Sequence, residues 1–264
     1  MDLAALVENV ISLTKQTGEF IRKEALSFDR SKIQYKGLHD MVSYVDKTAE
    51  INLVNGLSAL IPEAGFLTEE ETRTVLADDY NWIIDPLDGT TNFIHGIPTF
   101  SISIALQYKE ELIIGVVYEI NRDECFSAWK NGGAYLNGER ISVSAAPAIE
   151  NTLLATGFPF YEFSKMEKYL NVLRLLMQKC HGLRRIGSAA IDLSYVACGR
   201  FDGYFEYNLH SYDVAAGIVL VREAGGEVFD FSGGDDIIAR REIIATNGKI
   251  SSELLGIIKH EFDQ

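Results

Sequence analysis

The chain has 264 residues, 47% hydrophobic and 23% charged, a balance typical of a folded globular protein rather than a disordered one. Its 38 acidic and 24 basic residues give a formal net charge of −14, which repels phosphate backbones and anionic membrane surfaces. We therefore expect no direct nucleic-acid binding and no membrane partner. Some of the acids are instead available to bind divalent cations.

The cysteines and the first residues indicate a reducing compartment. Cys125, Cys180 and Cys198 are far apart, so neither a disulfide framework nor a thiolate zinc site is indicated. The opening MDLAALVENVISLTKQ carries acids among its apolar residues, unlike a signal peptide, and no apolar run is long enough to span a bilayer. We expect a soluble, cytoplasmic protein.

The first sixty residues predict two helices. Apolar residues recur at steps of three and four from Leu3 to Ile21, and again from Ala49 to Leu60, where Pro62 follows. The polar stretch KGLHDMVSYVD lies between them. We interpret it as a loop or hairpin that can move.

The pattern changes to strands from Gly65 to about Ile141. Short β-type runs follow one another there: GFLT, NWIID, FSISIALQY, LIIGVVYEI, ECFSAWK and AYLNGERI. Asn131-Gly132 and Asn137-Gly138 are strong turn signals between such runs. This part predicts a mostly antiparallel sheet.

After Ala145-Ala146-Pro147, predicted strands and helices alternate. The strands are LLAT, GLRRI, DGYFE, GEVF and EIIAT, and the helices lie near 166–177, 188–197, 214–223 and the end of the chain. Such alternation is typical of α/β architecture. We predict an α+β half over residues 1–145 and an α/β half over 146–264, forming one catalytic unit with a site between them.

The segment WIIDPLDGTTNF, residues 82–93, places two carboxylates directly after a buried run. Pro86 cannot donate a ladder hydrogen bond, so we expect the strand to end at Asp85. Gly89 then permits a tight turn and Thr90 opens a short helix with free N–H groups. Asp85 and Asp88 there fit either a bound cation or simple turn capping, and the segment alone does not separate the two.

Acidic residues elsewhere in the chain favour a bound cation over simple turn capping. Glu69, Glu70 and Glu71 follow the GFLT run, so Glu69 lies beside Asp85 if that strand neighbours NWIID. Asp213 stands at the N-terminus of an apolar helix, where a plain cap is the simpler explanation.

Three blocks together resemble the inositol monophosphatase superfamily of metal-dependent, lithium-sensitive phosphatases. They are FLTEEE at 66–71, WIIDPLDGTTNF at 82–93, and YDVAAG with EAGG at 212–217 and 223–226. Their order and spacing match over nearly the whole chain. The resemblance implies a layered α-β-α-β-α sandwich, the fold of the inositol monophosphatases and sugar phosphatases.

The resemblance also implies roles for the acidic residues. Two to three Mg²⁺ ions would be held by Glu69, Asp85, the Leu87 carbonyl, Asp88 and Asp213. Thr90 would activate the attacking water together with Glu69, with Asp46 in an auxiliary role. The amides of Gly89 and Thr90 would hold the phosphate.

A substrate-recognition block matches as well, in IGSAA at 186–190 and FEYNLHSYD at 205–213. Gly187, Ser188, Ala189 and Glu206 would line the pocket, and Glu206 would bond substrate hydroxyls. Three departures touch this region: family members often carry Gly at Thr68 and Trp at Tyr212, and KGLHD has no exact counterpart in the animal enzymes.

The implied activity is hydrolysis of inositol 1-phosphate or a related small polyol or sugar phosphate by metal-activated water, in a homodimer inhibited by lithium. Asp85 and Asp88 are three residues apart, which disfavours the D-x-D aspartyl-phosphate mechanism. The alternatives are a 3′-phosphoadenosine-5′-phosphate, fructose-1,6-bisphosphate, histidinol phosphate or NADP phosphatase. A further alternative is a regulatory module that binds a protein or RNA partner.

Overall fold

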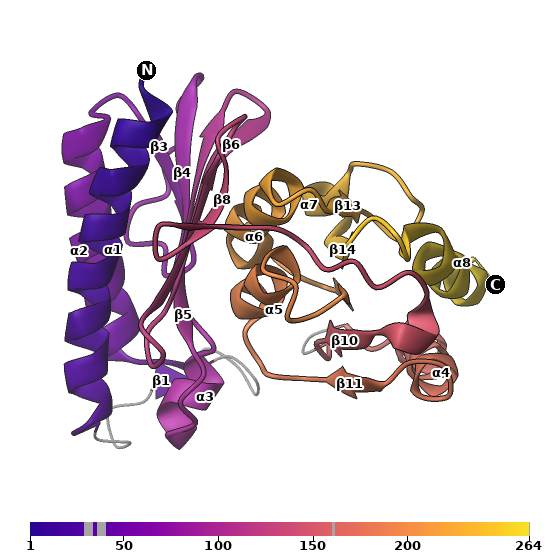
Figure 1. The fold of residues 1–264 in the computed structure, drawn as a ribbon. Helices are drawn as coiled ribbons and strands as arrows, with labels where there is room; N and C mark the ends of the chain where they lie inside the picture. Colours follow the sequence, from indigo (N-terminus) through magenta and orange to yellow (C-terminus); the bar gives the residue numbers. More distant parts are fainter. Residues whose placement is uncertain (29–33, 36–40, 160–161, 264) are drawn as a thin grey trace.

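The computed structural model describes residues 1–28, 34–35, 41–159 and 162–263, which form five alternating layers of helices and sheets (Figure 1). Two helices form one outer layer, two more lie between the sheets, and two cover the far side. In that order they are α1 (Leu3–Ala25) and α2 (Tyr44–Leu60), α5 (Ala189–Ala197) and α6 (Ser211–Glu223), and α4 (Met166–Met177) and α8 (Ser251–Phe262). The predicted α-β-α-β-α sandwich is confirmed.

The first sheet has seven strands in chain order, antiparallel throughout except for the parallel pair β3–β4. Its strands are β3 (Gly65–Thr68), β4 (Tyr80–Asp88), β5 (Ser101–Tyr108), β6 (Glu111–Glu119), β7 (Glu124–Trp129), β8 (Gly133–Leu136) and β9 (Glu139–Ile141). They correspond to the predicted runs, and AYLNGERI is divided into two strands by the Asn137-Gly138 turn.

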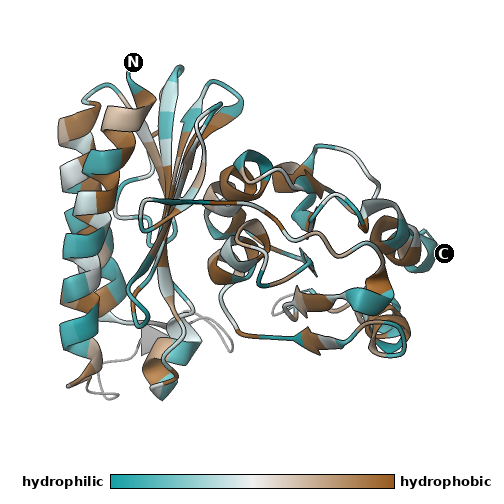
Figure 2. Cartoon of the chain, viewed as in Figure 1, coloured by the Kyte–Doolittle hydropathy of each residue, from teal (hydrophilic) through white to brown (hydrophobic). Residues whose placement is uncertain are grey.

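Both faces of this sheet are covered, which explains why its central strands are continuously apolar. Trp82 and Ile84 of β4 belong to the core shared with α1 and α2, whereas Ile83 belongs to the core shared with α5 and α6. Hydrophilic residues recur along α1 and α2, whose outer sides meet solvent (Figure 2).

The second sheet has five strands in the order β11-β10-β12-β14-β13. They are β11 (Gly182–Arg184), β10 (Leu153–Thr156), β12 (Gly203–Tyr207), β14 (Glu242–Thr246) and β13 (Glu227–Phe229). The three strands β11, β10 and β12 are parallel, and β14 is antiparallel to both of its neighbours. Two short elements were not predicted: the 3₁₀ turn Ile149–Asn151 and α7 (Ile237–Arg240).

The predicted loop or hairpin before α2 is partly wrong, because the helix begins earlier than its apolar periodicity. Ser43 caps α2, with its hydroxyl accepting from Val45 N and Asp46 accepting from Ser43 N, so Tyr44–Asp46 are the first helical turn. Ahead of the helix, β1 (Gln34–Tyr35) pairs with β2 (Met41–Val42) in an antiparallel hairpin. The remaining residues of the predicted loop, 36–40, lie outside the described residues.

The predicted end of β4 at Asp85 is also wrong. The strand runs on to Asp88, with a shift in register between Asp85 and Asp88 before Asp88 pairs with Ser101. Pro86 has no N–H for the ladder, and the irregularity places it where none is required. The bulge therefore keeps both carboxylates on one strand.

The division of the chain at residue 145 stays a prediction. All strands of the first sheet precede residue 142, yet α5 and α6 pack against that sheet from the second half of the chain. In the described part of the chain, no helix combines the length and apolar character that crossing a bilayer requires.

Candidate active site

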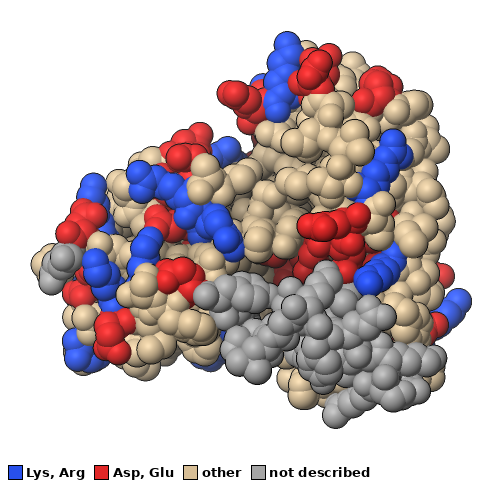
Figure 3. Space-filling model, turned by 180° about the vertical axis from the view of Figure 1, so that it is seen from behind, with Lys and Arg blue, Asp and Glu red and all other residues tan. Residues whose placement is uncertain are grey.

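A cavity of about 580 Å³ lies where the carboxyl end of β4 meets the N-termini of α5 and α6. The predicted metal-binding and substrate-binding residues all line it: Glu69, Asp85, Leu87, Asp88, Gly89, Thr90, Gly187, Ser188, Ala189, Glu206 and Asp213. Figure 3 shows acidic side chains gathered near the middle of the face turned away in Figure 1. The structure therefore brings together residues from both halves of the chain.

Parallel pairing of β3 with β4 places Glu69 beside Asp85. Thr68 lies opposite Ile84 in the register, and the backbone N–H of Glu69 donates to the Ile84 carbonyl at 3.2 Å. Because β3 ends there, the Glu69 side chain is free of the ladder and turns into the cavity. The predicted juxtaposition is confirmed.

The turn between β4 and α3 (Thr90–His95) carries the remaining predicted catalytic groups. Gly89, with φ of +97°, caps the helix in a left-handed conformation that favours glycine. The Thr90 hydroxyl lies 2.9 Å from the Leu87 carbonyl and 3.1 Å from Asp46 Oδ1. Asp46 thus lies buried behind Thr90 rather than in the cavity wall.

Asp88 joins the two halves across the cavity. Its Oδ2 accepts from the Ser188 hydroxyl at 2.6 Å and from the Ala190 N–H at 2.8 Å, at the N-terminus of α5. Asn92 of α3 donates to the Ile186 carbonyl at 2.9 Å. These contacts hold the turn after β4 against the predicted substrate-binding segment.

Asp213 and Glu206 complete the acidic lining. Asp213 lies in the first turn of α6 and its Oδ2 accepts from His210 N at 2.6 Å, so the predicted capping role is present. Glu206 on β12 accepts from the Tyr204 hydroxyl. A Cβ at position 157 would lie 1.9 Å from Glu206 Oε2, which explains why that position is glycine.

Burial and mutual repulsion raise the pKa values of acids that line the cavity. Desolvation, followed by the neighbouring carboxylates, raises the pKa of Asp85 well above its usual range, and burial does the same for Glu69 and Asp213. Burial raises the pKa of Asp88 to about 6 and that of Glu206 to about 7. So many buried acids require a source of positive charge to remain ionised together.

The lining fits a divalent cation by its chemistry. Carboxylates and a backbone carbonyl are the oxygen ligands that Mg²⁺ prefers, and the buried Glu69 Oε2 has no hydrogen-bond partner in the protein. Within the described ranges, no three Asp, Glu, His or Cys side chains already form a group that could hold an ion. Protein donors occupy Oδ2 of Asp88 and Oδ2 of Asp213, which is one of the two oxygens that each carboxylate can offer to a cation.

Sequence reasoning missed several lining residues, of which Asp192 is the most unusual. It is 1% exposed, its Oδ1 has no partner, and burial raises its pKa well above the usual range. A lone acid in the otherwise apolar AAIDLSYVA was a signal that could have identified it. Gly157, Phe158 and Pro159 also line the cavity, without a comparable signal in the sequence.

Two sheets separated by a helical layer, with an acid-lined cavity at their junction, define the class of the phosphatase-fold proteins. The chain belongs to the inositol monophosphatase family, whose model matches residues 2–261. The resemblance inferred from the three sequence blocks is thus confirmed. Proteins of this family are generally metal-dependent.

Curated relatives and solved structures agree on the family but carry different names. The chain is 41% identical over 252 residues to "Nus factor SuhB" of Escherichia coli K12, covering 95% of this chain and 94% of that one. It is 38% identical over 260 residues to the inositol-1-monophosphatase of Mesorhizobium japonicum, covering 98% of each. The expected absence of nucleic-acid binding gains no support from relatives named as Nus factors.

Two solved structures show how closely the fold is shared. The extragenic suppressor protein suhB of Bartonella henselae matches with a TM-score of 0.91 at 41% identity, covering 97% of this chain and 98% of that one. An IMPase of Thermotoga maritima matches with a TM-score of 0.88 at 31% identity, covering 100% and 99%.

Proposed function

We propose that this protein is a Mg²⁺-dependent phosphomonoesterase that hydrolyses inositol 1-phosphate or a related small polyol or sugar phosphate. The observation that carries the proposal is the convergence of acids from three separate segments at the N-terminus of α3: Glu69, Asp85 with Asp88, and Asp213. A relative named inositol-1-monophosphatase, at 38% identity, supports the same substrate class.

The proposed cofactor is two to three Mg²⁺ ions, held by Glu69, Asp85, the Leu87 carbonyl, Asp88 and Asp213. Bound divalent cations lower the pKa of water and offset the charge on phosphate oxygens. The protein's own part is to fix these ligands on separate elements packed in one fold, so that the phosphate meets them in one orientation.

The remaining groups act on the phosphate and on water. Gly89 and Thr90 stand at the N-terminus of α3, and their N–H groups donate to phosphate oxygens of the substrate. Glu69 accepts a proton from the attacking water, and Asp46 orients the Thr90 hydroxyl that positions this water. Water oxygen bonds to phosphorus as the ester P–O bond breaks, and the departing alkoxide takes up a proton from solvent, giving an alcohol and inorganic phosphate without a phosphoenzyme.

The alcohol part of the substrate would lie toward Glu206, Ser188 and Asp192. Glu206 and Asp192 are both buried acids, and after burial itself the charge of Glu206 contributes to the raised pKa of Asp192. Hydroxyl groups can exchange hydrogen bonds with such carboxyl groups, which supports recognition of a polyol. Arg185 in the same lining acts on both acids and lowers their pKa, against the effect of burial.

A panel of phosphoesters, assayed with and without Mg²⁺, tests the proposal. We expect Mg²⁺-dependent release of phosphate from inositol 1-phosphate, inhibited by lithium. Turnover of 3′-phosphoadenosine 5′-phosphate far above inositol 1-phosphate would contradict the substrate class. A covalent adduct trapped at Asp85 by a phosphate mimic would contradict the mechanism.

A second candidate function is binding of a protein or RNA partner, because relatives at 41% identity are named Nus factors. The intact acidic lining and Thr90 favour an active enzyme that also binds a partner over a module without activity. Mg²⁺-independent partner binding, with no hydrolysis of any phosphoester, would reverse this ranking.

We also propose that the protein is a homodimer. Light scattering of the protein as it elutes from a size-exclusion column would test this.

A further inference from the structure

Glu50 of α2 is a buried carboxylate that holds the segment directly after Glu69. Its side chain is fully buried, and it does not line the cavity. Its Oε2 accepts from the backbone N–H of Glu70 at 2.8 Å, and its Oε1 accepts from the N–H and hydroxyl of Thr72 at 2.8 and 2.6 Å. One side chain therefore satisfies three donors of a single loop.

These bonds hold the first residues of the loop that follows Glu69. Glu71 has φ of +55°, a left-handed conformation that is strained for a residue other than glycine. Without Glu50, the partly buried backbone N–H groups of Glu70 and Thr72 would lose this acceptor. Since Glu69 immediately precedes this loop, the direction of its carboxylate depends on how the loop is held.

The same face of α2 also reaches Thr90. Asp46 and Glu50 are four residues apart, one helical turn, and so lie on one side of the helix. Asp46 contacts the Thr90 hydroxyl while Glu50 holds the loop after Glu69. Of the two groups proposed to act on water, Glu69 directly follows β3 and Thr90 opens α3, and one face of α2 supports both.

We propose that Glu50 is a positioning residue that sets the Glu69 carboxylate relative to Thr90 for cation binding and water activation. This inference rests on the proposed function and adds to it a residue outside the cavity. Residues that hold metal ligands in place typically affect metal affinity or activity by about 10–100-fold when replaced.

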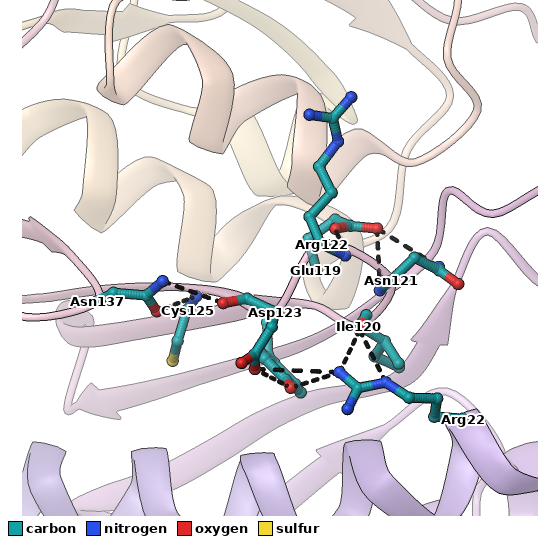
Figure 4. Close-up of polar contacts among 9 residues, drawn as sticks. Arg22, Glu119, Ile120, Asn121, Arg122, Asp123, Cys125 and Asn137 are labelled. Atoms are coloured by element: carbon teal, nitrogen blue, oxygen red, sulfur yellow. Dashed lines mark hydrogen bonds and ion pairs between the residues drawn. The ribbon is translucent and has the colours of Figure 1, made fainter.

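Glu50→Gln is the direct test, because it keeps the shape of the side chain but turns one acceptor into a donor facing an N–H group. Glu119→Gln is the matched control. Glu119 is 1% exposed and accepts from Asn121 N at 3.2 Å and Arg122 N at 2.5 Å, supporting the turn after β6 in the same way outside the cavity lining (Figure 4).

We expect Glu50→Gln to weaken Mg²⁺ binding about 10-fold or more, measured by titration calorimetry without substrate. At saturating Mg²⁺, kcat falls while KM for inositol 1-phosphate changes little. Amide hydrogen exchange speeds up at Glu70 and Thr72. Glu119→Gln is expected to lower Tm and leave Mg²⁺ affinity unchanged.

Wild-type Mg²⁺ affinity and kcat in Glu50→Gln, with only a lowered Tm as in Glu119→Gln, would overturn the inference. Thr72→Val is a second, milder test that removes one of the three donors and should also weaken Mg²⁺ binding. If both Thr72→Val and Glu50→Gln bind Mg²⁺ with wild-type affinity, the positioning role of Glu50 is overturned while the proposed function stands. A wild-type protein that neither binds Mg²⁺ nor hydrolyses any phosphoester would instead overturn the proposed function, and this inference with it.

Discussion

Asp85 is a buried acid that lies among other acids of the site. It is 2% exposed, Glu69, Asp88 and Asp213 all act on its charge, and its Oδ1 accepts from Leu87 N at 2.9 Å. An ionised carboxylate among other acids weakens the folded state unless a cation offsets the repulsion. A carboxylate at position 85 is therefore better explained by cation binding than by a contribution to the stability of the fold.

Asp85→Asn tests this explanation. The amide oxygen can still accept from Leu87 N, but the charge that attracts a cation is lost. We expect phosphatase activity to fall at least about 100-fold, the upper range for partners of metal ligands. Because repulsion is relieved, Tm of the metal-free protein at neutral pH should equal or exceed that of the wild type. A large loss of Tm would indicate a structural role instead.

Thr90 offers a test in which only a hydroxyl changes. Thr90→Ala removes the group that contacts Asp46 and Leu87, whereas Thr90→Ser retains it. We expect kcat to fall about 100-fold or more in the alanine variant, the lower range for a lost acid–base group, and to be largely retained in the serine variant. Equal activity of the two variants in steady-state assays would exclude a role for the hydroxyl.

At the level of elements, the turn from β4 to α3 depends on Gly89. A Cβ there would lie 3.1 Å from the Thr99 carbonyl and 3.2 Å from the Gly187 carbonyl, at a φ of +97°. Gly89→Ala should cost about 1–2 kcal/mol of unfolding free energy in conformational strain alone and raise KM as the phosphate-binding amides shift. Denaturant unfolding and steady-state kinetics measure the two effects.

Gly138→Ala is the control for this prediction. Gly138 has φ of +83° and no atom within 4 Å of an added Cβ, so the variant carries similar strain without crowding. Its KM should be that of the wild type. If Gly89→Ala and Gly138→Ala raise KM equally, the rise in KM reflects a general loss of stability and not a specific role of Gly89 at the site.

An ion pair connects the start of β7 to the turn that follows α5, and its contribution to the free energy of unfolding depends on pH. The Arg200 guanidinium donates to Glu124 at both oxygens and lowers the pKa of this carboxyl below its ordinary value of 4.5. Stability from a lowered pKa is present above the unfolded value and is lost as pH falls through the folded value. The Arg200 side chain is 36% exposed, so solvent limits the contribution to about 1 kcal/mol.

Glu124→Gln should therefore destabilise the protein near neutral pH and have progressively less effect below pH 4.5. Urea unfolding of wild type and variant across this range measures the difference. The exposed acid Glu110, changed to Gln, serves as a control with little effect at any pH. A difference that grows toward acidic pH would contradict a lowered pKa of Glu124 in the folded protein.

For the whole molecule, a net charge of −14 and a buried acidic site predict that divalent cations stabilise the fold. A ligand that binds only the native state adds about 2.7 kcal/mol at 100 times its Kd. MgCl₂ should raise Tm well beyond NaCl of equal ionic strength, and Asp85→Asn should remove most of the difference. Equal effects of the two salts in a thermal melt would indicate screening of surface charge only.

The sequence predicted most helices and strands because apolar periodicity and spacing are local, but it missed the turn Ile149–Asn151 and α7. It placed Glu69 beside Asp85 only on the condition that their two runs form neighbouring strands, which β3 and β4 meet. It failed where a contact between distant residues decides the outcome. The bulge that carries β4 past Pro86 depends on pairing with β5, and the approach of Asp192 to Glu206 depends on how α5 packs against the second sheet.

The helical layer between the sheets has a consequence for synthesis. The face of the first sheet that carries Ile83, Ala105 and Val117 is covered by α5 and α6, which are translated long after the strands themselves. Chains emerge from the ribosome N-terminus first. Through the intervening stretch of translation this apolar face lacks its cover, so the first sheet cannot complete its core until α6 has emerged.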